Sequence, residues 1–143
     1  MGFMKFVGDV GNLVGGKKPQ ASTDIEKHLV ETFGDKIKDL QVVYLDGTVT
    51  LGGACDSQAT KEKAVLLAGN LKGVSKVQFD NLTAPAAAET VEYYTIKSGD
   101  TLWKIARQFY NDGNKYPKIF EANKEVIKDP NLIFPGQQIR IPK

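Results

Sequence analysis

Few side chains that could carry out chemistry occur in this chain. His28 is the only histidine and Cys55 the only cysteine, and the pattern places them in different predicted elements. A nucleophilic thiolate needs a base beside it, and a zinc ion needs several ligands gathered in one place. We therefore expect Cys55 to be a small buried hydrophobic residue and His28 to lie at the edge of a helix.

The acidic residues after position 92 do not form a catalytic pair either. Glycoside hydrolysis requires two carboxyl groups positioned across a cleft. The five candidates fall at predicted caps, turns or exposed faces: Asp100, Asp112, Glu121, Glu125 and Asp129. The sequence therefore predicts a protein that binds a ligand and is not an enzyme.

Charge and hydropathy narrow the range of ligands. The net charge is +2, with 10 basic and 12 acidic residues up to position 92 and 9 basic and 5 acidic residues beyond it. The chain lacks the dense stripe of basic residues that is typical of nucleic-acid binders, so we expect no nucleic acid partner. Because the pattern contains neither an apolar run of membrane-spanning length nor a signal peptide, we expect a cytoplasmic protein without a transmembrane segment.

Glycine, proline and alanine divide the chain into four predicted parts. Residues 83–92 read as an Ala/Pro linker, and the GGKKPQ stretch before position 21 reads as a hinge. Phe3, Phe6, Val7 and Val10 would share one face of a helix. We therefore predict a helical segment over 1–20 that docks onto a domain at 21–82, and a second domain at 93–143.

The first domain has the pattern αββαβ. A capping box at Thr23 and Glu26 begins a helix, Asp46 and Gly47 form a tight hairpin turn, and Ser57 caps a second helix. A last strand begins near Val74. Since one apolar face of a sheet must be covered, this order predicts a two-layer α+β sandwich with three strands and two helices.

The second domain has the pattern βααβ. Asp100 is placed to cap a helix whose buried stripe begins at Leu102 and recurs at helical spacing, and Pro117 suits the first turn of the next helix. Trp103 lies off that stripe. Its indole is expected to stack on a sugar or to pack against the first domain, and the sequence favours neither.

Two stretches of the first domain resemble a BON domain. They are residues 46–53 (DGTVTLGG) and residues 73–77 (GVSKV), separated by the predicted helix. The resemblance covers residues 21–82 and implies the two-layer sandwich.

Three separate blocks of the second domain resemble a LysM domain, in the family's order and spacing. They are residues 94–102 (YTIKSGDTL), 120–123 (FEAN) and 131–142 (NLIFPGQQIRIP). The resemblance implies a groove for N-acetylglucosamine-containing glycans between two loops. The residues that would line it are Gly99, Asp100, Thr101, Leu102, Asn131, Leu132 and Ile133. The alternative is that these residues only build the fold.

The whole chain, including its opening MGFMKFV, resembles the small cytoplasmic potassium-binding BON–LysM proteins of proteobacteria. This resemblance implies K⁺ as the ligand, bound reversibly with a change of conformation, in a sensor or buffer that we expect to be a monomer. The competing hypothesis is a cell-envelope protein that attaches to peptidoglycan through its LysM groove, which requires export.

A large monovalent cation is well held by several neutral carbonyl oxygens, and helix ends leave such carbonyls unpaired. Two glycine-interrupted turns fit this requirement, over 7–13 and 68–73. We expect them to converge and to bind K⁺ through main-chain carbonyls. The expected donors are Val7, Val10, Gly11, Leu13, Gly69 and Leu71. The alternative is that both turns are ordinary helix caps.

Overall fold

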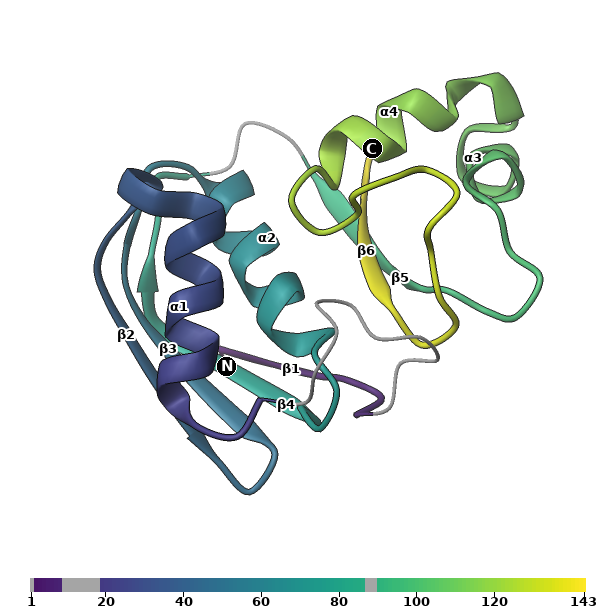
Figure 1. The fold of residues 1–143 in the computed structure, drawn as a ribbon. Helices are drawn as coiled ribbons and strands as arrows, with labels where there is room; N and C mark the ends of the chain where they lie inside the picture. Colours follow the sequence, from purple (N-terminus) through teal and green to yellow (C-terminus); the bar gives the residue numbers. More distant parts are fainter. Residues whose placement is uncertain (1, 9–18, 87–89) are drawn as a thin grey trace.

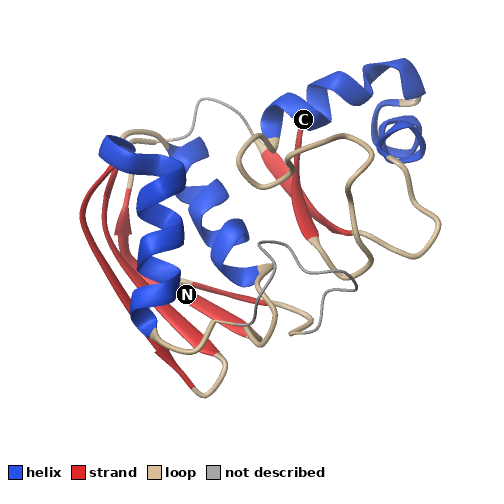
Figure 2. Ribbon diagram, in the orientation of Figure 1, coloured by secondary structure: helices blue, strands red, loops and turns tan. Residues whose placement is uncertain are grey.

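The computed structural model describes residues 2–8, 19–86 and 90–143. They form an α+β fold with two parts, which we call the N-terminal domain (up to residue 86) and the C-terminal domain (from residue 90). The predicted fold class is confirmed: the first part contains αββαβ and the second βααβ. Figure 2 shows two helices packed on one side of the N-terminal sheet.

The N-terminal domain follows the predicted order of elements. They are α1 (Ser22–Phe33), a short 3₁₀ helix (Gly34–Lys36), β2 (Ile37–Leu45), β3 (Thr48–Cys55), α2 (Gln58–Gly69) and β4 (Lys76–Thr83). Asp46 and Gly47 turn the chain between β2 and β3 with φ angles of 50° and 78°, as the hairpin signal requires. The apolar face of α1, with Ile25, Leu29 and Phe33, is buried on the sheet.

The sheet has a fourth strand that the sequence did not predict. β1 (Phe3–Lys5) pairs antiparallel with β4, so the strand order is β1-β4-β3-β2, with β3 and β4 parallel. The predicted helical face is therefore wrong for this stretch: Phe6 is buried in the core, whereas Val7 is 54% exposed. The open edge of β4 explains the difference, because its main chain pairs with residues 2–6. Val10, the fourth residue of that face, lies outside the described residues.

Of the helix starts predicted for the N-terminal domain, that of α2 is confirmed and that of α1 is wrong. The hydroxyl of Ser57 accepts a hydrogen bond from the Thr60 N–H (3.1 Å) and caps α2, as expected. The capping box at Thr23 is wrong, because α1 begins at Ser22 without a side-chain cap. The Ser22 hydroxyl instead accepts a bond from the Tyr44 N–H of β2 (2.8 Å), so it satisfies a main-chain donor at the sheet edge.

The C-terminal domain is small. It contains β5 (Val91–Thr95), α3 (Leu102–Tyr110), a 3₁₀ helix (Gly113–Lys115), α4 (Tyr116–Ala122) and β6 (Gln138–Pro142). β5 and β6 form an antiparallel pair. The buried stripe of α3 is confirmed for Leu102, Ile105 and Ala106, and Pro117 occupies the first turn of α4.

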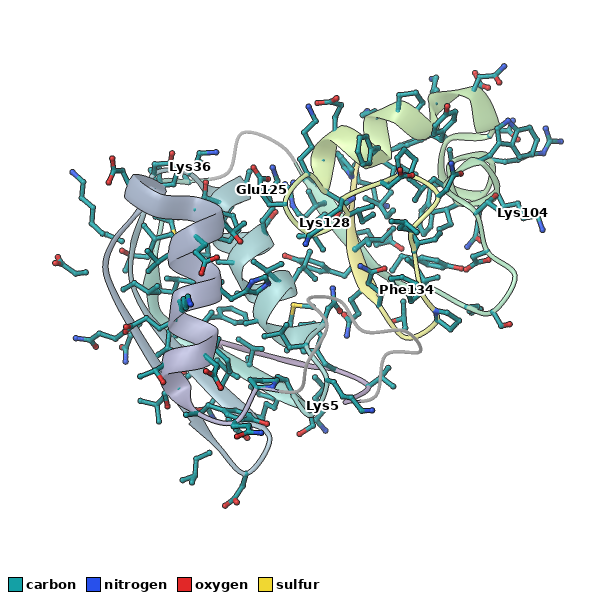
Figure 3. All side chains as sticks on the ribbon, in the orientation of Figure 1. Lys5, Lys36, Lys104, Glu125, Lys128 and Phe134 are labelled. Atoms are coloured by element: carbon teal, nitrogen blue, oxygen red, sulfur yellow. The ribbon has the colours of Figure 1, made fainter. Side chains whose placement is uncertain are left out.

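The two domains meet where α2 faces β6 and the loop after α4 (Figure 1). Arg140 of β6 donates to the Glu62 carboxylate of α2 at 2.8 Å, and both side chains are largely buried. The Lys63 Nζ atom lies 2.9 Å from Oε1 of Glu125, and the Lys36 Nζ atom lies 3.8 Å from Oε2 of the same carboxylate (Figure 3). Val126 is 2% exposed and packs into the N-terminal core. Buried contacts therefore fix one domain against the other.

Gly69 leaves room at the end of α2 for Phe6, the residue after β1, because a Cβ at position 69 would lie 2.1–2.3 Å from atoms of the Phe6 ring. We predict that Gly69→Ala lowers the free energy of unfolding by about 1–3 kcal/mol, since the Phe6 ring must leave its place. Urea denaturation measures this. Gly52→Ala is the control, because a Cβ there makes only ordinary contacts of 3.5 Å or more. Equal stability of wild type and Gly69→Ala would contradict the predicted clash.

Glu62→Ala removes the carboxylate that accepts from the buried Arg140 guanidinium across the domain contact. We predict that Glu62→Ala lowers the free energy of unfolding by about 3 kcal/mol. The matched control is Glu31→Ala, whose ion pair with Lys27 is exposed and 4.0 Å long and should contribute less than about 1 kcal/mol. Similar losses in the two variants would show that the inter-domain pair is no stronger than a surface pair.

Candidate functional site

The two predicted turns meet in their described parts. The Gly8 carbonyl oxygen, just after β1, accepts a hydrogen bond of 2.8 Å from the Gly73 N–H, in the turn after α2. The Tyr44 hydroxyl donates to the Gly73 carbonyl oxygen at 3.3 Å. Gly73 is thus held from both sides, and the end of β1 lies against the C-terminal end of α2.

Three of the six expected carbonyl donors belong to the described residues: Val7, Gly69 and Leu71. The Leu71 carbonyl oxygen already accepts a bond of 3.2 Å from the Val74 N–H, which closes the turn internally. Within residues 2–8, 19–86 and 90–143, no donor reaches the carbonyl oxygens of Val7 or Gly69. Val10, Gly11 and Leu13 lie outside the described residues.

The C-terminal domain also reaches this place, which the sequence analysis missed. The Gln138 side-chain amide donates to the Lys5 carbonyl oxygen at 2.6 Å. A Cβ at Gly136 would lie 3.5 Å from the Val7 side chain, so the loop before β6 touches the residue after Phe6. Figure 3 labels Lys5 at the end of β1 and Phe134 in that loop. No local pattern could reveal these contacts, because they join residues about 130 positions apart.

No group of three or more His, Cys, Asp or Glu side chains within the described ranges is placed to hold a metal ion. The Nε2 atom of His28 is buried and has no hydrogen-bond partner among these residues, and burial lowers the pKa of its imidazole. Burial raises the pKa of the Cys55 thiol to about 11, so the thiol stays protonated at neutral pH. Cys55 is 6% exposed, as predicted for a small core residue.

A second site lies in the C-terminal domain, in a pocket of about 290 Å³. Five of the seven residues predicted for the glycan groove line it: Asp100, Thr101, Leu102, Asn131 and Ile133. Gly99 and Leu132 are not among its lining residues. The pocket also includes Trp103, Tyr116 and Pro130, of which the sequence analysis singled out only Trp103.

Asp100 supports the pocket wall in a way that differs from the prediction. Its carboxylate accepts bonds from the Tyr94 hydroxyl (2.5 Å) and the Lys97 N–H (2.9 Å), and so ties the loop back to β5. The cap of α3 is Thr101, whose hydroxyl accepts from the Lys104 N–H. Burial and the bond to Asp100 raise the pKa of Tyr94 to about 12.

Trp103 is 46% exposed and forms part of the pocket, so its indole is available to a ligand there. A Cβ at Gly113 would lie 2.1 Å from the indole ring, which shows that the ring lies directly on this glycine. Because Gly113 has no side chain, the indole of Trp103 can lie against its main chain.

In the part of the chain that the structure describes, no helix combines the length and the apolar character needed to cross a bilayer. Two family models match the chain. The BON domain matches residues 18–85 and the LysM domain matches residues 94–142, and neither is a catalytic domain.

Curated proteins from several bacteria are similar to this chain. A protein of Escherichia coli O6:H1 named "Potassium binding protein Kbp" is 38% identical over 149 residues, which cover 100% of this chain and 99% of the relative. An uncharacterized protein of Deinococcus radiodurans is 36% identical over 72% of this chain and 44% of its own length. Resuscitation-promoting factor Rpf of Micrococcus luteus is 36% identical over 39% of this chain and 23% of its own length.

The agreement with the E. coli protein runs through both domains and the N-terminal segment. With its BON domain followed by a LysM domain, the chain therefore belongs to the Kbp family.

Proposed function

We propose that this protein binds K⁺ reversibly in the cytoplasm and acts as a monomeric K⁺ sensor or buffer. The observation that carries the proposal is the similarity to a protein named for potassium binding over the full length of both chains. A similarity confined to the LysM domain would not favour an ion over a glycan.

The position of the turns supports a site built from main-chain oxygens. The end of β1 and the end of α2 are joined through Gly8 and Gly73, so the carbonyls of Val7 and Gly69 belong to one small region. The C-terminal end of α2 carries the negative end of a helix dipole, which favours a cation. Val10, Gly11, Leu13 and Leu71 complete the proposed set of donors, and neutral carbonyls suit a large monovalent ion.

Binding is proposed to change the conformation by linkage. An ion that holds carbonyls from both turns stabilises the arrangement in which residues 1–20 lie against the BON domain, because that arrangement has the higher affinity. Since the LysM domain contacts the same region through Gln138, the relative position of the domains would respond to the ion as well.

Thermal unfolding of dialysed protein in KCl, NaCl and LiCl of equal ionic strength tests whether the protein binds K⁺ specifically. At a K⁺ concentration about 100-fold above its dissociation constant, we expect K⁺ to stabilise the folded state by about 2.7 kcal/mol, with a matching rise in melting temperature. Because general screening acts alike for all three salts, equal melting temperatures in them would refute specific K⁺ binding.

The LysM pocket favours a second candidate function, the binding of an N-acetylglucosamine-containing glycan. The pocket presents an exposed indole beside Asn131 and the α3 N-terminus, a combination of aromatic and polar groups that suits a sugar ring. In an exported chain this would give attachment to peptidoglycan. Fractionation of cells that express a tagged chain separates the two roles, because recovery from the cytosol alone excludes attachment.

Titration with chitin oligomers tests the pocket. We expect Trp103→Ala to weaken glycan binding about fivefold, because the indole face is lost. Leu45→Ala is the control, since Leu45 is 68% exposed, ends β2 in the N-terminal domain and does not line the pocket. If wild-type protein binds no oligomer, or if both variants bind as wild type does, the pocket has no such role.

A further inference from the structure

The outer edge of β6 is closed by two asparagine side chains. One edge of β6 pairs with β5, and the main-chain groups of Gln138 and Arg140 point to the other side. The Asn123 amide donates to the Arg140 carbonyl (2.8 Å) and accepts from the Arg140 N–H (2.7 Å). The Asn70 amide makes the same two bonds to Gln138, at 2.8 and 2.9 Å. Each amide replaces a neighbouring strand at one residue.

The two asparagines differ in origin. Asn123 belongs to the LysM domain itself, whereas Asn70 follows the last residue of α2 in the BON domain. Asn70 is 0% exposed, and its neighbours Gly69 and Leu71 are two of the proposed carbonyl donors. A buried amide without partners costs about 1–3 kcal/mol, so the main chain of Gln138 is held firmly at the C-terminal end of α2.

The side chain of Gln138 extends the connection to the other turn. Its amide nitrogen donates to the Lys5 carbonyl oxygen at 2.6 Å, two residues before Val7. One residue of the LysM domain is therefore bonded beside both parts of the proposed site. Its main chain is bonded to Asn70, which lies between Gly69 and Leu71, and its side chain is bonded to Lys5 at the end of β1. Because the Glu62–Arg140 pair and Val126 fix β6 on α2, this bridge has a rigid base.

We propose that Gln138 is a positioning residue for the K⁺ site, with Asn70 as its anchor in the BON domain. By holding Lys5 and the end of α2 at once, Gln138 sets the separation of the two turns whose carbonyls bind the ion. The LysM domain thus determines the affinity for K⁺ without contributing a ligand. This inference rests on the proposed function.

The direct test is calorimetric titration of full-length protein with KCl, for wild type and Gln138→Ala. The variant keeps the main-chain bonds to Asn70 and loses only the bond to Lys5, so it should fold. We expect its dissociation constant for K⁺ to rise about tenfold, roughly the effect of one good hydrogen bond. Gln108→Ala, which removes an exposed glutamine side chain of α3, should leave the constant unchanged.

Melting temperatures separate positioning from general stability. For Gln138→Ala, the melting temperature in NaCl should stay close to that of wild type, while the additional rise in KCl should shrink. For Asn70→Ala, both should fall, because the anchor is buried. A Gln138→Ala protein with the wild-type affinity and the wild-type rise in KCl would overturn the inference while K⁺ binding by wild type stands. Failure of wild type itself to bind K⁺ would overturn the proposed function, and the inference with it.

Discussion

The main-chain edge of β6 requires hydrogen-bond partners, and this requirement joins the two domains. A two-stranded sheet leaves half of its strand groups unpaired, and a buried unpaired group is costly. The LysM domain supplies its own partner for Arg140 through Asn123, but Gln138 is completed by Asn70 of the BON domain. The ion pair of Glu62 with Arg140 lies beside this contact, and its buried charges require the domains to stay together.

One short stretch of chain, residues 69–73, therefore has several roles at once. It ends α2, anchors β6 through Asn70, and meets the end of β1 through Gly73. Gly69 leaves room for Phe6, the residue after β1. Two of the proposed K⁺ donors, Gly69 and Leu71, belong to this stretch, so binding of the ion there would affect β1, α2 and β6 together. The LysM pocket lies on α3 and the loop before Ile133, and its lining shares no residue with this region.

The sequence predicted features that depend on neighbours along the chain. The Asp46–Gly47 turn, the Ser57 cap and the stripe of α3 are local, and the structure confirms them. The sequence predictions were wrong where contacts between distant residues determine the local structure. Phe3–Lys5 forms a strand because the edge of β4 is open to pairing. Asp100 does not cap α3, because its carboxylate accepts bonds from Tyr94 and Lys97, and Thr101 caps the helix instead. The bonds between Asn70 and Gln138 have no sequence signature, since the residues near Asn70 in the chain do not indicate that its side chain pairs with a distant strand.

The claim on which this account depends is that main-chain oxygens from the two joined turns hold a large alkali ion. Crystals grown with Rb⁺ or Tl⁺ in place of K⁺ test it most directly, because the anomalous signal locates the ion. The account predicts one strong peak at coordination distance from the carbonyl oxygens of Val7 and Gly69. A peak elsewhere in the molecule, or no peak beside these two carbonyls, would contradict it.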